Sequence, residues 1–243
     1  MNADSIDLES FSTTDAMVSE LAKCWITRMN DRRHRPFRVA LSGGRVAARF
    51  QQQAGQLAIQ QRFDWTAIEF FWGDERCVPP DHSDSNFRAA NEALLIPCGI
   101  PNGQIHRLRG ELNPLEGARF AMEELARCCP LNEEGWPILD LVFLGMGEDG
   151  HVASLFPNTP TNQAYSRDWV IPVIGPKPPP QRLSLTYGVL AAAREVWVLA
   201  SGADKGPALA ASLAKNGNTP LAQLLKKRGK TLVATEKSLF SAM

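Results

Sequence analysis

The sequence predicts an α/β fold in which helices cover a mostly parallel sheet. Short apolar runs that are typical of strands alternate along the chain with longer amphipathic stretches that are typical of helices, and parallel sheets are built in this order. The 243 residues, 44% of them hydrophobic, suffice for one large α/β domain or two small ones around a well-buried core.

Short apolar runs predict seven strands. In chain order they lie at residues 37–41, 68–72, 139–144, 169–173, 183–185, 195–199 and 231–234. Each of the first three leads into a polar loop. The loop after the second strand, residues 73–86, is too long and too rich in turn residues to be a simple connector.

Amphipathic stretches predict four helices. The first begins after Thr13 or Thr14, either of which can act as its N-cap, because the following apolar residues share one helical face. These residues are Met17, Val18, Leu21, Ala22 and Trp25. The other three helices are expected at 46–59, 86–95 and 114–128. The proline run at 176–180 suits neither a helix nor a central strand, so we expect an extended surface segment there.

Charge and cysteine content exclude several classes of protein. The 26 Lys and Arg residues balance the 26 Asp and Glu residues, so the positive field that usually drives nucleic-acid binding is absent and any anion must be bound by local donors. The N-terminus does not resemble a signal peptide, and no window is apolar enough to cross a membrane. The five cysteines are odd in number and form no C-x-x-C pair, so neither a disulfide framework nor a zinc site is indicated, and a cytoplasmic location is expected.

The loops after the first three strands are candidates to share one site, because the carboxyl ends of parallel strands meet at one edge of a sheet. Ser42-Gly43-Gly44 lies between a strand and a helix, where backbone N–H groups suit a phosphate; a simple tight turn is the alternative. Arg76 suits a phosphate or a developing oxyanion, and a surface ion pair is its alternative role. Asp81-His82-Ser83-Asp84 offers metal-ligand residue types, but a turn and a helix cap near Asn86 need fewer assumptions.

The third loop contains Gly145-x-Gly147-x-x-Gly150, which matches the dinucleotide-binding fingerprint as a string. That fingerprint must open a full helix, and Phe156-Pro157 follows too soon, so we do not expect a nicotinamide or flavin cofactor. The loop also places His151 next to Asp149, and a histidine beside a carboxylate can act as the general base that activates water. A histidine that merely caps a turn is the alternative, and Arg76 on the neighbouring loop favours catalysis.

Two long segments resemble the signature motifs of the 6-phosphogluconolactonase family. They are WGDERCVPPDHSDSN at residues 72–86 and LGMGEDGHVASLFP at residues 144–157. Shorter matches, SGG at 42–44, RLSLT at 182–186 and GADK at 202–205, keep the family's order, so the resemblance covers nearly the whole chain. It implies one doubly wound α/β domain over residues 1–243, of the NagB/RpiA-like type with helices on both faces of the sheet and no segment left for a second function.

The resemblance also implies hydrolysis of 6-phospho-D-glucono-1,5-lactone to 6-phospho-D-gluconate, the second step of the oxidative pentose phosphate pathway, with no metal or other cofactor. In this chemistry His151 takes a proton from water and returns it to the ring oxygen, Asp149 orients the imidazole, and Arg76 stabilises the oxyanion or reaches the phosphate. The family pattern places Arg182 and Lys205 near the phosphate, which would rest on the backbone of the Ser42–Gly44 loop. The expected substrate and phosphate ligands are therefore Ser42, Gly43, Gly44, Arg45, Arg182 and Lys205.

The first loop departs from the family pattern. The family usually continues Ser-Gly-Gly with Ser/Thr-Thr-Pro, whereas this chain has Arg45-Val46-Ala47. Val46 lacks the hydroxyl expected to donate to phosphate, and Ala47 lacks the proline that presets the first helical turn. Because Arg45 can supply a charge-assisted bond, we expect weaker substrate binding and not a loss of activity.

Two other functions stay open at this point. One is a sugar-phosphate sensor without catalysis, although a sensor has no need of a base and its orienting acid. The other is a glucosamine-6-phosphate deaminase, a related enzyme that would need its own acid-rich loop where this chain has Asp74-Glu75-Arg76. In each case the partner is a small phosphorylated sugar, with no nucleic acid or membrane, and we expect a monomer or a weak homodimer.

Overall fold

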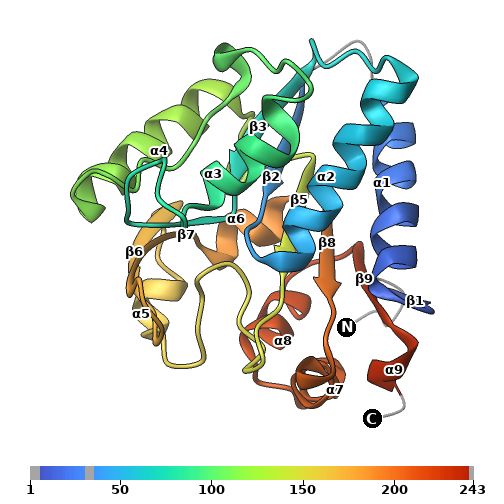
Figure 1. The fold of residues 1–243 in the computed structure, drawn as a ribbon. Coiled ribbons are helices and arrows are strands. Elements are labelled where there is room, and N and C mark those ends of the chain that lie inside the picture. Colours follow the sequence, from blue (N-terminus) through green and yellow to red (C-terminus); the bar gives the residue numbers. More distant parts are fainter. Residues whose placement is uncertain (1–5, 31–35, 241–243) are drawn as a thin grey trace.

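A parallel sheet of six strands forms the centre of the protein (Figure 1). The structure is a computed structural model and describes residues 6–30 and 36–240. In spatial order the strands are β1 (Ile6–Phe11), β9 (Thr231–Glu236), β8 (Glu195–Ala200), β5 (Leu141–Gly145), β2 (Phe37–Leu41) and β3 (Ile68–Trp72), and every pair is parallel. The prediction of a mostly parallel α/β sheet is confirmed.

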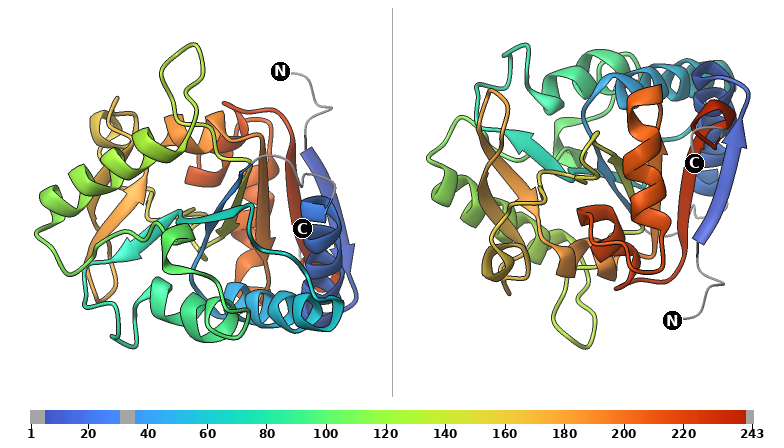
Figure 2. Two further views of the ribbon diagram at one scale, coloured as in Figure 1. Left: turned by 90° about the horizontal axis from the view of Figure 1, so that it is seen from above. Right: turned by 90° about the horizontal axis from the view of Figure 1, so that it is seen from below.

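Helices cover both faces of this sheet (Figure 2). On one face lie α1 (Thr14–Asn30) and α2 (Arg45–Gln61), and on the other lie α6 (Tyr187–Ala192) and α8 (Pro220–Leu225). An aromatic cluster joins the first pair of helices to the sheet: Trp25 and Phe50 pack on Phe143 with ring centroids 5.3 and 4.6 Å away, and Phe143 packs on Trp197 at 5.5 Å.

A second, smaller sheet has three antiparallel strands, which the sequence did not predict as a separate sheet. They are β4 (Asp74–Arg76), β7 (Gln181–Leu185) and β6 (Val170–Ile174), in that order, and α4 (Pro114–Cys128) packs against β6 and β7. The link at 175–180 is too short for the crossover that a parallel pair requires, so β6 and β7 form a hairpin. The proline run is this surface link, and it is bent where an extended segment was expected.

The remaining helices are short. They are α3 (Asn86–Ala90), η2 (Asn91–Leu95), η3 (Asn102–Gln104), α5 (Thr161–Ala164), η4 (Ala203–Lys205), α7 (Gly206–Leu213) and α9 (Lys237–Phe240). The helix predicted at 86–95 is present, but its second half is a π-helix. In the two stretches that the structure describes, no helix combines the length and apolar character needed to span a bilayer.

The loops at the carboxyl ends of the parallel strands gather at one edge of the sheet. Leu41 at the end of β2 pairs in register with Trp72 at the end of β3, and Gly145 of β5 pairs with Leu199 of β8. The chain therefore brings the loops after β2, β3, β5 and β8 together, and α7 lies below this edge in the view of Figure 1.

Candidate active site

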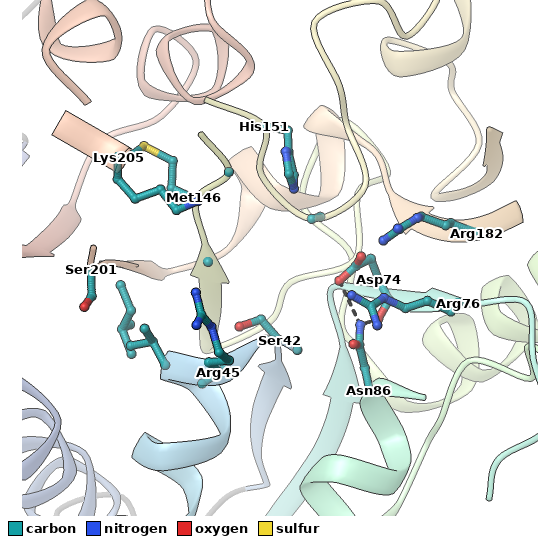
Figure 3. Close-up of a pocket in the computed structure, with 18 residues that line it drawn as sticks. Ser42, Arg45, Asp74, Arg76, Asn86, Met146, His151, Arg182, Ser201 and Lys205 are labelled. Atoms are coloured by element: carbon teal, nitrogen blue, oxygen red, sulfur yellow. Dashed lines mark hydrogen bonds between the residues drawn. The ribbon is translucent and has the colours of Figure 1, made fainter. Parts of the chain in front are cut away.

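A cavity of about 250 Å³ lies at this edge of the sheet (Figure 3). All of the predicted site residues except Asp149 line it, and Asp149 is hydrogen-bonded to the lining residue His151. The predicted residues in the lining are Ser42, Gly43, Gly44, Arg45, Arg76, His151, Arg182 and Lys205. The three loops chosen from the sequence therefore share one site.

The loop after β2 presents backbone donors to the cavity. The Gln51 side chain donates to the Ser42 carbonyl at 3.0 Å and fixes the loop. Gly44 is the N-cap of α2, with φ +95°, and provides no side-chain cap for the first N–H groups of the helix. These groups and the positive end of the helix dipole suit a phosphate. Gly43 must lack a side chain, because a Cβ there would lie 1.8 Å from Asn86 Oδ1.

His151 and Asp149 form a hydrogen-bonded pair in the loop after β5. The ring Nδ1–H of His151 donates to Asp149 Oδ1 at 2.6 Å, and the His151 backbone N–H donates to the same oxygen at 3.1 Å. Burial raises the pKa of Asp149, but these hydrogen bonds outweigh it and hold the pKa below its usual value. A Cβ on Gly147 would lie 2.0 Å from His151 Nδ1, so this glycine makes room for the imidazole. Nε2 is then the ring nitrogen that is free to serve the cavity.

Arg76 and Arg182 are direct cross-strand neighbours on β4 and β7. An Nη of Arg76 donates to the Asp84 carbonyl at 2.6 Å, and an Nη of Arg182 to the Lys177 carbonyl at 3.3 Å. Within the described residues, the buried Nε atom of each arginine has no hydrogen-bond partner. Burial and the neighbouring Arg76 charge lower the pKa of Arg182. Two guanidinium groups held this close favour an anion or a developing oxyanion between them.

Arg45 and Lys205 lie on the opposite side of the cavity from that arginine pair (Figure 3). Lys205 Nζ is 2.9 Å from Asp204 Oδ2, and its side chain is 20% exposed. Arg45 lines the cavity, and its charge helps to lower the pKa of Asp204. No hydrogen bond or ion pair with a described residue holds its guanidinium away from a ligand. The site thus has two cationic poles, and His151 lies between them in the view of Figure 3.

The structure adds lining residues that the sequence did not single out. Asp74, Asn86 and Ser201 carry polar groups, and Ser201 donates to Glu236 Oε1 at 2.6 Å. Asp74 and Ser201 closely follow the ends of β3 and β8, which is the signal that could have found them. Asn86 has no such signal, because its approach to Gly43 depends on the fold.

The other motifs have structural roles. Ser85 caps α3 by accepting from the Arg88 N–H at 3.1 Å, and His82 Nδ1 accepts from the Asp84 N–H at 3.1 Å, which confirms a turn and cap in this loop. After Gly150 the chain forms turns and isolated bridges before the short helix α5 begins, so the helix that a dinucleotide fingerprint requires does not follow.

One cluster outside the cavity has metal-ligand residue types: Glu69, His106 and Cys128. The two ring nitrogens of His106 are bonded to Glu69 and, at 3.0 Å, to Glu124. Cys128 Sγ is 3.8 and 3.9 Å from the two nitrogens, both of which already have a closer carboxylate partner. This geometry is that of an imidazole bridging two carboxylates.

Comparisons with known proteins agree with the motifs. The family model described as glucosamine-6-phosphate isomerases/6-phosphogluconolactonase matches residues 12–233. A 6-phosphogluconolactonase of Mycobacterium tuberculosis is 33% identical over 216 residues, covering 86% of each chain.

Solved structures share the fold over nearly the full chain. A 6-phosphogluconolactonase of Trypanosoma brucei has a TM-score of 0.84 and 26% identity, covering 99% of this chain and 100% of that one. A monomeric glucosamine-6-phosphate deaminase has a TM-score of 0.80 at 16% identity, covering 98% of this chain and 100% of that one, and it shows the fold alone. The chain belongs to the family of glucosamine-6-phosphate isomerases and 6-phosphogluconolactonases.

Proposed function

We propose that His151 activates the water with which the chain hydrolyses 6-phospho-D-glucono-1,5-lactone to 6-phospho-D-gluconate. The observation that carries this proposal is the His151–Asp149 hydrogen bond of 2.6 Å at the wall of a cavity with two cationic poles. The Mycobacterium and Trypanosoma relatives are both named 6-phosphogluconolactonase. The chain is an enzyme with this activity, and it hydrolyses a phosphorylated sugar lactone of the pentose phosphate pathway.

The proposed reaction needs only a base and a positive group, because a lactone carbonyl is already electrophilic. His151 Nε2 takes a proton from water, and the oxygen of that water bonds to C1 of the lactone. The C1 carbonyl electrons move onto its oxygen, which carries the negative charge of the tetrahedral intermediate. When the intermediate collapses, the bond between C1 and the ring oxygen breaks, and the imidazolium returns the proton to that oxygen. Asp149 keeps the ring oriented and stabilises its protonated form throughout.

The two cationic poles have separate roles in this proposal. The phosphate binds to the backbone N–H groups of the Ser42–Gly44 loop and to Arg45 and Lys205. Arg76 and Arg182 face the carbonyl and stabilise the oxyanion. The family resemblance assigned Arg182 to the phosphate, but its register position opposite Arg76 favours the second pole.

Kinetics with two lactones test this division. Replacing Lys205 with Ala should raise KM for the phosphorylated lactone and leave hydrolysis of glucono-1,5-lactone, which lacks the phosphate, nearly unchanged. Replacing Arg182 with Ala should lower kcat for both lactones. If Arg182→Ala instead acts only on KM of the phosphorylated lactone, this arginine binds phosphate and the assignment from the resemblance is correct.

One experiment separates the proposed mechanism from the alternatives. The lactone is generated in place with glucose-6-phosphate dehydrogenase, and its loss is followed after subtraction of spontaneous hydrolysis, with glucosamine 6-phosphate as the control substrate. Rapid loss with wild-type protein and none with folded His151→Ala supports the proposal. Ammonia release would indicate a deaminase, and saturable binding without turnover a sensor. Wild-type turnover in His151→Ala would eliminate His151 as the base.

We also propose a cytoplasmic setting and a monomer or weak homodimer. The cysteines are all free thiols, and burial raises the pKa of Cys77 to about 11 and of Cys129 to about 12, so these two thiols stay protonated and unreactive. Light scattering of the purified protein over a range of concentrations tests the oligomeric state.

A further inference from the structure

Asp74 is a buried carboxylate in the cavity that the proposed mechanism does not use. It lies at the start of β4, lines the cavity and is only 6% exposed. No cation among the described residues lies within ion-pair distance of it, although Arg76 and Arg182 share its part of the cavity (Figure 3). A buried carboxylate is costly unless donors satisfy it.

The protein itself supplies only part of the donors that Asp74 can accept. Ser154 Oγ donates to Oδ2 at 2.6 Å, and Asn86 Nδ2 donates to Oδ1 at 3.2 Å. The same Asn86 nitrogen makes its shorter bond, 2.9 Å, to the Asp74 carbonyl. An ionised carboxylate has about four acceptor positions, so about half of its capacity is left for groups in the cavity.

The chemistry of Asp74 selects the kind of group that it can accept. Its negative charge repels a phosphate or carboxylate and attracts an O–H or N–H donor. The proposed orientation places the phosphate at Arg45 and Lys205, on the opposite side of the cavity from Asp74 (Figure 3). Among the hydroxyl-bearing ring carbons of the six-membered lactone, C2 and C3 are the farthest from the phosphate-bearing C6. Their hydroxyls are therefore the donors that reach Asp74.

We propose that Asp74 is a specificity-determining residue that accepts hydrogen bonds from the C2 and C3 hydroxyls of the lactone. This inference rests on the proposed function and deepens it. Asp74 makes the site select phosphorylated lactones that carry ring hydroxyls at this end. The adjacent arginines bind the carbonyl end, and Asp74 prevents this pole from becoming a general anion site.

The test compares the parent lactone with its 2-deoxy and 3-deoxy forms. A hydrogen bond to a charged group changes affinity by about 10- to 100-fold, so wild-type kcat/KM should fall by about this factor for at least one deoxy lactone. In Asp74→Asn the preference for the parent should shrink at least fivefold, because the charged acceptor is gone. If that variant does not fold, Asp74→Ser serves the same purpose.

Ser154→Ala is the matched control, because Ser154 is fully buried, contacts the same carboxylate and does not line the cavity. It should keep the preference for the parent lactone whatever it does to stability. Equal wild-type kcat/KM for all three lactones, or an Asp74→Asn loss that is the same for all three, would overturn the inference and leave the lactonase function intact. Failure of the wild-type protein to exceed spontaneous hydrolysis of the parent would instead refute the proposed function itself.

Discussion

Asp149→Asn gives the sharpest test of the proposed base. The change keeps the size of the side chain and removes the charge that His151 Nδ1–H meets at 2.6 Å. A hydrogen bond to a charged group is worth about 1.5–3 kcal/mol. The two side chains are 31% and 36% exposed, so solvent screens the pair. We therefore expect a loss of about 1.5–2 kcal/mol of transition-state stabilisation, which corresponds to a fall in kcat/KM of about 10- to 30-fold. The fall should come from a lower kcat and not from a higher KM.

The pH dependence gives this prediction a second readout. Because the pKa of Asp149 lies below its usual value, its carboxylate is ionised at neutral pH and loses its charge only as the pH falls through that lowered pKa. Asn at this position removes the carboxylate at every pH. The protonated form of an imidazole is less stable without a neighbouring carboxylate than with one. Protonation of the base should therefore need a lower pH in the variant, and the acid limb of the pH–rate profile should move to lower pH.

The assay is steady-state hydrolysis of the lactone across the pH range, with spontaneous hydrolysis subtracted at each point. Glu148→Gln is the matched control, because Glu148 is the neighbouring acid, is 53% exposed and pairs with Lys177 at 2.6 Å. Its kcat/KM should stay within about twofold of wild type. A folded Asp149→Asn protein with wild-type kcat, or a loss confined to KM, would refute the role of Asp149 as the orienting acid.

The remaining predictions concern the loop and the stability of the fold. Gly43→Ala places a methyl group 1.8 Å from Asn86 Oδ1, so KM should rise and urea unfolding should show a loss of about 1–3 kcal/mol; no change in either would contradict this close approach. Val46→Thr offers the phosphate a hydroxyl worth about 1 kcal/mol, so KM should fall about fivefold; an unchanged KM would mean that the phosphate needs no further donor. Burial raises the pKa of Glu195, but the hydrogen bond from Lys230 and the charge of Arg28 outweigh this effect and hold the pKa below its usual value. The stabilisation is therefore present above the usual pKa and is lost as the pH falls through the lowered pKa. Glu195→Gln should therefore cost about 2 kcal/mol at pH 7 and progressively less as the solution is made more acidic. A cost in urea unfolding that does not fall with pH would be inconsistent with an ionised pair.

The elements that were predicted best are those whose signals are local. The strands at Phe37–Leu41 and Ile68–Trp72 and the helix Pro114–Cys128 have their predicted bounds. The helix begins with proline after Asn113, whose side chain accepts from the Leu115 N–H at 3.1 Å, and both features are readable from the sequence.

The elements that were missed depend on distant partners. Strand β1 is mostly exposed and pairs with β9 from the other end of the chain. Its sequence therefore lacks the run of apolar residues that predicts a buried strand. Strand β4 has three polar residues and is a strand only because Asp74 pairs with Ser184 and Arg76 with Arg182. The second sheet follows from these pairings, and the hydrophobic periodicity of the sequence does not predict which distant strands pair.

The same limit applies to the site. His151, Asp149 and the Ser42–Gly44 loop were found because they stand directly after strands whose carboxyl ends must meet. Asn86 was missed because it reaches Gly43 from the start of α3, across a loop whose path the sequence does not fix.

The chain has 26 cationic and 26 acidic residues, yet its cavity is strongly cationic. The two facts are compatible because the net charge counts every residue, whereas only a few residues line the cavity. Arg45, Arg76, Arg182 and Lys205 all line one cavity, as the sequence predicted. Burial of Arg182 costs solvation, and the charge of Arg76 beside it adds repulsion. An anionic substrate relieves both costs at once, whereas the acidic Asp74 beside them limits that relief to ligands that also bring hydroxyl donors. Specificity for a polyhydroxylated phosphate ester then follows from placing one carboxylate with spare acceptor capacity beside Arg76 and Arg182, in a cavity that four cations line.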